Sequence, residues 1–345
     1  MTTRASIRQV AQLAGVSPMT VSNVLRSSPG QMGEETRKRV LKAIRELDYI
    51  PVRTSAQNRH VRTNAIGIVF LQEMQGAVGY PTFKGMCSRA KALDHDLTIF
   101  LRSEPDWVKP GSESQFLDRR CDGFIFVGEN RREISEALVR RKIPIVECYS
   151  ADPPEGVGKV LGNNSDGTRQ AVQHLIGLGH EKIAHIAGPV GNKEADERLS
   201  GYRNAMFDAF GPRHFEFIAR GDTWGDLWGF LDGQDEIGKE TRPLAAQVLS
   251  SGATAVVCAN DLFALGLWRL AAERGLKVPE DLSITGLDNI IEGAHKGLTS
   301  ISVPFEEIGR AAIDAVLSML DGGEAGNSIN VLPVSLVKRS STGPR

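Results

Sequence analysis

The sequence predicts a small all-α domain followed by an α/β body of two lobes, each a doubly wound parallel sheet. Three observations support this prediction. Two short amphipathic helical patterns, with almost nothing between them, lie in the stretch SIRQVAQLAGVSPMTVSNVLRSS, residues 6–28. From residue 64 onward, short β-rich runs alternate with helical stretches, which is typical of parallel sheets covered on both faces. The alternating region is longer than one doubly wound sheet needs, so two lobes are expected.

Three helices are expected in the first 50 residues. The first carries apolar residues at helical spacing, with Ser6 as its N-cap, and it ends at Gly15, which accepts the backbone angles of a tight turn. Ser17 caps the second helix, and Pro18 takes its first position, where a missing N–H costs nothing. A third helix is expected over residues 34–48, because apolar residues recur on one face. Three helices around one small core, the first two joined by a glycine turn, describe a helix-turn-helix unit.

The second helix is expected to read DNA, because in a helix-turn-helix unit it lies in the major groove. Asn23 can make paired hydrogen bonds to adenine, and Met19 can pack on a thymine methyl group. The other candidate contacts are head residues suited mainly to the phosphate backbone: Ser6, Ser17, Pro18, Thr20, Ser22, Arg26, Thr36 and Tyr49. Taken alone, Thr20 and Ser22 could be ordinary exposed helix residues. The charge agrees with DNA binding, since residues 1–62 carry 11 Lys and Arg against 4 Asp and Glu, whereas the remaining residues carry 30 against 38.

The segments IRQVAQLAGVSPMTVSNVLRSS and EETRKRVLKAIRELDYIP resemble the headpiece of LacI/GalR transcriptional repressors, and the resemblance continues to the C-terminus. It implies a headpiece at residues 1–50, a hinge at 51–63 and an effector-binding and dimerisation domain at 64–341. It also implies a homodimer that binds a double-stranded DNA operator of pseudopalindromic sequence. Repression rather than activation is expected on the same grounds.

The hinge segment PVRTSAQNRHVRTN, residues 51–64, is polar and basic without apolar periodicity, so composition alone predicts a flexible linker. In the LacI/GalR family this segment folds on DNA, and an apolar side chain, usually leucine, opens a base step in the minor groove. This sequence has Asn58 at that position and Val52 where asparagine is usual. We therefore hypothesise weaker bending of the operator, or recognition through hydrogen bonds, with Ser55 as a further contact. A bend angle that does not increase in Asn58→Leu would contradict this hypothesis.

The resemblance implies lobes of the periplasmic-binding-protein type, with lobe 1 at about residues 64–162 and 290–320 and lobe 2 at about 163–289 and 321–341. A ligand of such sheets binds at the carboxyl ends of the strands, here in the cleft between the lobes. The candidate ligand-binding residues are polar or aromatic side chains at strand ends and loop starts: Tyr80, Asp166, Arg198, Trp224, Asn260, Asp288 and Phe305. Asp and Asn with an Arg can bracket vicinal hydroxyls, and an aromatic ring can stack on a pyranose.

Structural explanations compete with ligand binding at several of these positions. Asp166, for example, could simply cap a helix. For Arg198, Asn260 and Asp288 the resemblance favours ligand binding, because the matching family positions are recurrent effector contacts. For the other four candidates both explanations stand. The segment GDTWGDLWGFLDGQDEIGKETRP exceeds the usual family spacing between strand and helix, and it is either a lid over the cleft or an exposed loop.

No cofactor, metal or catalytic activity is expected. The sequence lacks GxSxG, P-loop, HExxH and Rossmann glycine patterns. Its four cysteines are scattered without a CxxC pair, which favours buried free thiols. No apolar run approaches the roughly 18–20 residues that a membrane span needs. The start MTTRASIRQV also lacks the apolar stretch of a secretory signal, so we expect a cytoplasmic protein rather than a periplasmic solute-binding protein.

The sequence therefore predicts a ligand-responsive DNA-binding repressor. The Arg, Asn and Asp set favours a sugar or sugar derivative as effector, while a nucleobase or a phosphoprotein co-regulator remains open, as does the choice between inducer and co-repressor. After Arg339 only SSTGPR follows, so no tetramerisation helix is evident and a dimer is expected. Besides an enzyme and a periplasmic solute-binding protein, a DNA-organising protein without an effector is a third alternative, and the two-lobed body argues against it.

Overall fold

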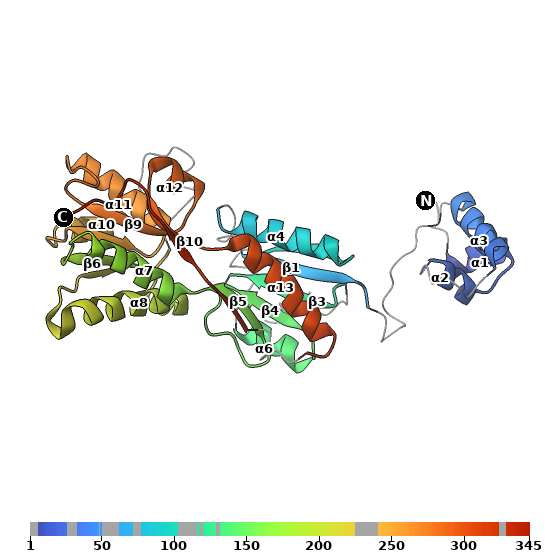
Figure 1. Cartoon of the computed structure of the whole chain (residues 1–345). Helices are drawn as coiled ribbons and strands as arrows, with labels where there is room; N and C mark the ends of the chain where they lie inside the picture. Colours follow the sequence, from blue (N-terminus) through green and yellow to red (C-terminus); the bar gives the residue numbers. More distant parts are fainter. Residues whose placement is uncertain are drawn as a thin grey trace. The chain divides into compact units, whose positions relative to one another are not determined.

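The computed structural model describes residues 6–25, 33–47, 49, 62–71, 77–102, 116, 120–128, 132–224, 241–323 and 329–345. The chain divides into two compact units, Met1–Val61 and Arg62–Arg345, which we call the head and the body (Figure 1). Predicted residues Arg26, Ser55 and Asn58 lie outside the described residues, as does the segment 225–240.

The head contains three helices: α1 (Ile7–Ala14), α2 (Pro18–Leu25) and α3 (Glu34–Glu46). The expected caps are present, because Ser6 Oγ accepts from the N–H of Gln9 at 3.4 Å and Ser17 Oγ accepts from the N–H of Thr20 at 3.1 Å. Gly15 ends α1 with φ +65°. The third helix stops two residues before its predicted end. One small core joins the helices: Val10, Ala11, Ala14, Val21, Val24, Val40 and Ala43.

Lobe 1 of the body is built on a parallel six-stranded sheet of order β11-β5-β4-β3-β1-β2. Its strands are β1 (Ala65–Leu71), β2 (Asp96–Arg102), β3 (Gly123–Val127), β4 (Ile145–Cys148), β5 (Gly158–Gly162) and β11 (Ile329–Leu332). Its helices are α4 (Gly79–Ala92), α6 (Arg132–Arg140) and α13 (Phe305–Leu320). Met86 of α4 and Ile308 of α13 pack on one face of the sheet, whereas Leu138 of α6 packs with Phe124 and Phe126 on the other.

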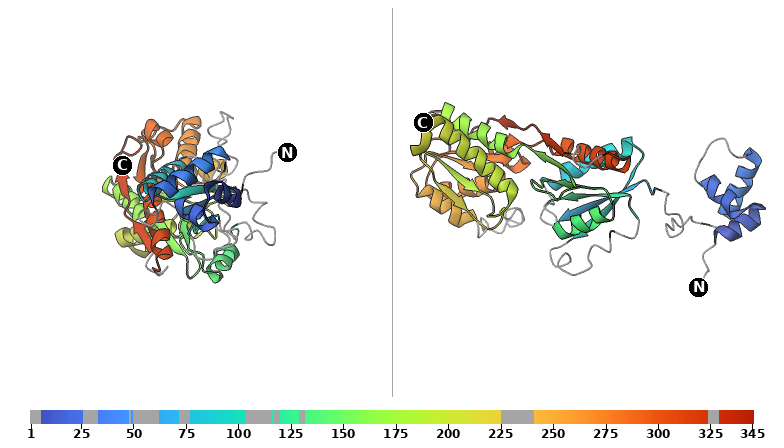
Figure 2. Two further views of the ribbon diagram at one scale, coloured as in Figure 1. Left: turned by 90° about the vertical axis from the view of Figure 1, so that its right-hand side faces the viewer. Right: turned by 90° about the horizontal axis from the view of Figure 1, so that it is seen from below.

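Lobe 2 carries a second six-stranded sheet, of order β12-β10-β9-β8-β6-β7, in which only β12 runs antiparallel. Its strands are β6 (Ile183–Ala187), β7 (Ile218–Arg220), β8 (Ala255–Cys258), β9 (Ser283–Asp288), β10 (Thr299–Ser302) and β12 (Ser335–Val337). Its helices are α7 (Asn164–Gly177), α8 (Lys193–Phe210), the 3-10 turn η3 (Gly211–Arg213), α10 (Thr241–Leu249), α11 (Asp261–Glu273) and α12 (Ile291–Lys296). Helices cover both faces of each sheet, as the second view shows (Figure 2).

The two lobes repeat one topology. In each, the second strand lies outside the first, and the third, fourth and fifth strands follow on the other side. A sheet of this order binds ligands where the strand order reverses, outside the carboxyl ends of the first and third strands. In lobe 2 that point lies after Ala187 of β6 and Cys258 of β8.

The predicted division of the chain between the lobes is wrong at two segments. Strand β10 pairs with β9 and so belongs to lobe 2, although residues 290–302 were expected in lobe 1. Strand β11 pairs with β5 and so belongs to lobe 1, although residues 329–332 were expected in lobe 2. The chain therefore passes between the lobes after β5, after β10 and after β11. Strand β10 was not predicted because its Thr299 and Ser300 are polar yet fully buried. The Thr299 hydroxyl donates to the Arg339 carbonyl, and the Ser300 hydroxyl donates to the Asp261 carboxylate.

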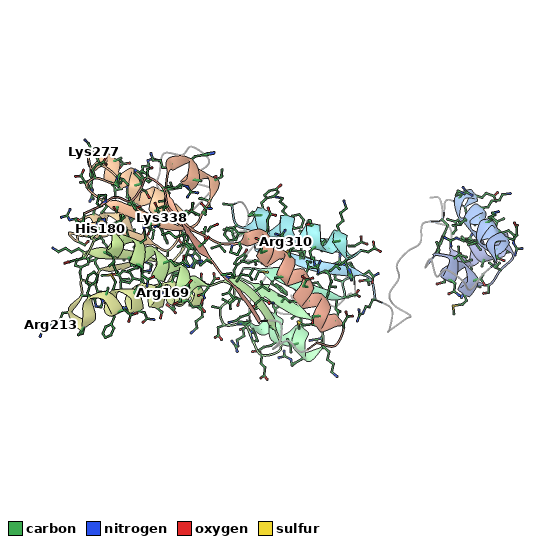
Figure 3. All side chains as sticks on the ribbon, viewed as in Figure 1. Arg169, His180, Arg213, Lys277, Arg310 and Lys338 are labelled. Atoms are coloured by element: carbon green, nitrogen blue, oxygen red, sulfur yellow. The ribbon has the colours of Figure 1, made fainter. Side chains whose placement is uncertain are left out.

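Helices α4 and α13 meet backbone to backbone. A Cβ on Gly85 would collide with the carbonyl oxygen of Glu306, and a Cβ on Gly309 would collide with that of Thr82. The pair is also joined at its surface by ion pairs from Lys84 to Glu306 and from Arg89 to Asp314, 2.6 and 2.7 Å long. Arg310, labelled on α13 in Figure 3, pairs with acidic residues of its own helix.

All four cysteines are free thiols, as expected. Three are buried, whereas Cys87 is only half-buried. In the described parts of the chain, we find no helix with the length and hydropathy of a membrane span.

Candidate nucleic-acid interface and ligand cleft

Helix α2 buries one side in the head core and exposes the other. Val21 and Val24 are buried in the head core, whereas Met19 is 68% exposed and Asn23 is half-buried. Ser17 and Pro18 are exposed, and Thr20, Ser22 and Thr36 are half-buried. The helix thus presents its predicted base-contacting residues outward from a core that fixes their direction.

Several residues predicted to contact DNA also stabilise the fold of the head. The Ser17 hydroxyl lies 2.9 Å from that of Thr20 and caps α2, and Ser6 forms a capping box with Gln9. Tyr49 packs against the head core. These bonds fix the ends of the helices, and the Ser6 hydroxyl already donates to Gln9 Oε1 at 2.9 Å.

In the body, Arg198 is the centre of a polar cluster at the start of α8, where the strands of lobe 2 end. Its side chain is buried, and its Nε donates to Asn164 Oδ1 at 2.9 Å while its Nη1 donates to the Ala259 carbonyl at 2.6 Å. The guanidinium lies 4.7 Å from the centre of the Trp224 ring. We call Arg198, Asn164, Trp224, Asn260 and Asp288 the Arg198 cluster. Among the described residues no carboxylate forms an ion pair with Arg198, so its charge is held by neutral acceptors and an aromatic face.

Both polar atoms of the Asn260 side chain bond within the protein, and one of these bonds positions Trp224. Its Oδ1 accepts from the N–H of Phe263 at 2.8 Å and caps α11, and its Nδ2 donates to the Trp224 carbonyl at 2.8 Å. The Trp224 ring fills the space that a side chain on Gly188 would occupy. Asn260 and Trp224 are therefore both in the cluster, where they hold Arg198 in position.

Two carboxyl groups lie close to Arg198 without pairing with it. Asp288 ends β9 with φ +114°, and Glu194 lies in the first turn of α8. Burial raises the pKa of each to about 7, while the charge of Arg198 acts in the opposite direction. A third acid, Asp261, also has a pKa raised to about 7 by burial, but it accepts hydrogen bonds from Ser300 and the N–H of Ile290 and has a structural role.

Tyr149 of lobe 1 faces the cleft and packs on Phe305 in the core of that lobe. Phe305 begins α13 and meets Tyr149 edge to face, with ring centres 6.0 Å apart. The Tyr149 hydroxyl lies 2.5 Å from that of Thr82. Burial raises the pKa of Tyr149, and the negative charges of Glu194 and Asp288 on the other lobe raise it further. Tyr149 and Glu194 also line one hollow, so the facing walls of the two lobes lie close together.

Three predicted ligand residues are not brought to the Arg198 cluster, and one of them, Phe305, is buried in the core of lobe 1. The Asp166 carboxylate accepts from Arg169, labelled in Figure 3, and from Gln170 on its own helix, and the Arg169 bond, the larger cause, holds the pKa of Asp166 below its usual value. Gln170 in turn donates to the Val334 carbonyl, so Asp166 belongs to the packing of α7 on β12. Tyr80 is 70% exposed near the start of α4.

Three residues of the cleft were missed by sequence analysis: Asn164, Tyr149 and Glu194. Glu194 had a detectable signal, because it precedes Arg198 by four residues and so shares its helical face. Asn164 and Tyr149 act through contacts 34 and 67 residues away in sequence, and no local pattern indicates them.

The comparisons with known proteins agree with this architecture. Residues 6–52 match the family described as "Bacterial regulatory proteins, lacI family", and residues 172–342 match "Periplasmic binding protein-like domain". The lactose operon repressor of Escherichia coli (strain K12) is 30% identical over 348 residues, which cover 98% of this chain and 90% of that repressor. The chain belongs to the LacI family. The predicted helix-turn-helix head and two-lobed periplasmic-binding-protein-like body are thereby confirmed.

Solved structures of LacI-family proteins share the whole fold. The lac repressor dimer bound to operator and the anti-inducer ONPF superposes with a TM-score of 0.77 at 27% identity, covering 99% of both chains. The regulator CelR, in complex with cellobiose, superposes with a TM-score of 0.68 at 27% identity, covering 98% of this chain and all of that one. This LacI-family chain is accordingly a DNA-binding transcription regulator with an effector-binding body, and the relatives described are regulators rather than enzymes.

Proposed function

We propose that this LacI-family protein is a repressor that binds a pseudopalindromic operator as a homodimer and responds to a sugar-like effector in the cleft between its lobes. The observation that carries the effector assignment is the unpaired placement of Arg198 beside Asp288. The charge of Arg198 lowers the pKa of Asp288 against the effect of burial, yet no hydrogen bond or ion pair joins the two among the described residues.

A polyol fits this arrangement chemically. The guanidinium offers donors in a fixed fork, and the ionised carboxylate offers only acceptors. Neighbouring hydroxyls of a sugar ring can accept from Arg198 and donate to Asp288, which connects two groups that are now separate. Trp224 and Asn260 take the role of positioning residues, because the bonds of Asn260 and the stacking of Trp224 hold Arg198 in place. Tyr149, which packs on Phe305, supplies an aromatic wall from lobe 1.

Operator recognition is assigned to α2. Asn23 would read an adenine, Met19 would contact a thymine methyl, and the hydroxyls of the head would contact phosphates. Two-fold symmetry of a dimer would place two such helices on the two halves of an inverted repeat. The relative bound to operator as a dimer supports this arrangement.

The test is selection of bound DNA from a random pool by the full-length protein, at low and at near-physiological salt. We expect one inverted repeat to be enriched at both salt concentrations. Binding that disappears at higher salt without any sequence preference would contradict the proposal, because counterion release alone behaves in that way. The selected DNA then serves as the probe for a second step, in which monosaccharides, disaccharides and nucleobases are tested for a change in operator affinity. A response to nucleobases and to no sugar would overturn the effector assignment while leaving operator binding intact.

A further inference from the structure

A hollow lies between the lobes, beside the Arg198 cluster. Lobe 1 lines it with Arg132 at the start of α6 and with Tyr149 and Ser150 after β4, and lobe 2 lines it with Lys193 and Glu194 at the start of α8. Its volume is about 180 Å³. That volume is many times the ~10–15 Å³ that one water needs, but it is smaller than the ~300–1,000 Å³ of a complete small-molecule site. The hollow therefore suits part of a ligand rather than a whole one.

The charges around the hollow favour a neutral group with many hydroxyls. Lys193 and Arg132 are exposed cations, while Glu194, the exposed Asp152 and the buried Glu147 are acids. An anion placed here would meet three carboxyl groups, and a cation would meet two positive side chains. A polyol can instead accept from the cations and donate to the acids at the same time.

Glu194 connects the hollow to the Arg198 cluster. It lines the hollow, and it also interacts with the charge of Arg198 and with the amide of Asn164. Helix geometry accounts for this double contact, because residues four apart on α8 lie on one face. A ligand bound at Arg198 can therefore extend past Glu194 into the hollow without leaving the cleft.

We propose that the hollow is a second subsite, which takes a hydroxyl-rich unit joined to the one bound at Arg198. The effector is then a two-unit compound such as a disaccharide rather than a single sugar. This inference rests on the proposed function, since it extends the same cleft.

The experiment compares sugars of one and two units on the full-length protein. Glucose and galactose are titrated calorimetrically beside cellobiose, maltose, lactose and melibiose. At least one disaccharide is expected to bind about tenfold or more tightly than either of its constituent sugars, because it fills both subsites. Lys193→Ala should reduce the affinity for that disaccharide roughly three- to tenfold, as expected for a lost hydrogen bond, and leave monosaccharide affinity unchanged. Lys277→Ala is the matched control, since this exposed lysine lies at the end of lobe 2 away from lobe 1 (Figure 3).

The outcomes separate this inference from the function on which it rests. A monosaccharide that binds as tightly as every disaccharide containing it, with no effect of Lys193→Ala, overturns the second subsite and leaves a sugar-responsive regulator. Binding of no sugar at all overturns the sugar assignment and the second subsite together, whereas operator selection still reports independently on DNA binding.

Discussion

The guanidinium of Arg198 lies over the ring of Trp224, and the backbone carbonyl of Trp224 accepts a 2.8 Å hydrogen bond from Asn260. Asn260 therefore fixes Trp224, and Trp224 in turn supports Arg198. Arg198 keeps an unused donor, because its Nη2 has no partner among the hydrogen bonds described.

Replacing Arg198 should abolish the effector response. Arg198→Ala removes the only cation of the cluster, so effector affinity should fall by roughly 2–5 kcal/mol. Operator affinity should stay at the wild-type value, since the head is a separate unit. Arg203→Ala is the control, because this residue of the same helix pairs with Glu216 at the surface. Calorimetry with effector and fluorescence anisotropy with operator provide the two measurements, and a normal effector response in Arg198→Ala would refute the assignment.

Effector affinity should depend on pH through Asp288. Burial raises the pKa of this carboxyl to about 7, so it is mostly ionised at pH 8 and mostly protonated at pH 6. If the ionised form accepts from ligand hydroxyls, affinity should rise by up to about tenfold from pH 6 to pH 8. Asp288→Asn should flatten most of this dependence, with a remainder from Glu194, whose pKa is also raised to about 7. An unchanged pH profile in the variant would exclude Asp288 as the acceptor.

The buried His185 should make stability depend on pH with a known sign. Its ring stacks on Tyr202 at 5.0 Å, its Nδ1 donates to the Val257 carbonyl at 2.8 Å, and burial lowers its pKa to about 4. The unfolded chain takes up this proton near pH 6.5 and the folded chain only near pH 4, so stability is lost as pH falls through that window.

Buried Asp261 and Asp288 act in the opposite direction, because their raised pKa makes the folded chain hold protons that the unfolded chain releases above pH 4. A comparison with His185→Phe isolates the histidine. From pH 7 to pH 5, wild type should lose about 2 kcal/mol more than the variant in urea unfolding. Parallel pH profiles for the two proteins would contradict the lowered pKa of His185.

The contact between α4 and α13 should tolerate no side chain at Gly309. A methyl group there collides with the Thr82 carbonyl, so Gly309→Ala should cost about 1–3 kcal/mol through displacement of the two helices. Gly177→Ala is the control, since no atom lies within 4 Å of an added Cβ on that helical glycine, and its stability should be equal or up to ~1 kcal/mol greater. Thermal unfolding of both variants distinguishes crowding from a general effect of replacing helical glycines. Equal stability in both would show that the helices can separate freely.

Replacing Asn23 should weaken specific DNA binding alone. Asn23→Ala removes a side chain presented outward by α2, and operator affinity should fall by about 1–3 kcal/mol. Affinity for random DNA should change little, because phosphate contacts do not involve this amide. Effector binding should also remain normal. The two affinities are measured in parallel by anisotropy, and equal losses on operator and random DNA would show that Asn23 contacts the backbone instead.

Much of the fold could be predicted from the sequence, because buried parallel strands are continuous apolar runs. Gly123–Val127 is buried along its whole length, so its residues form an apolar run that predicts a strand. Strand β10 was not visible, since its buried Thr299 and Ser300 are satisfied by partners about 40 residues away. At the cleft, the sequence identified Arg198 and Asp288 as chemistry-bearing residues. It could not identify Asn164 or Tyr149, whose contacts depend on tertiary packing, or the direction of the Asn260 amide.

The three passages of the chain between the lobes have a consequence for its synthesis. Strands β11 and β12 complete both sheets, yet both come from residues 329–337, which leave the ribosome after all the other strands described. Until then β5 and β10 are open sheet edges, one on each lobe. Open edges pair readily with other chains, so a nascent chain stopped after residue 323 should aggregate rather than give one finished lobe and one unfinished lobe. Neither sheet can be completed before the other, so the open edges of both lobes are closed at the same late stage of synthesis.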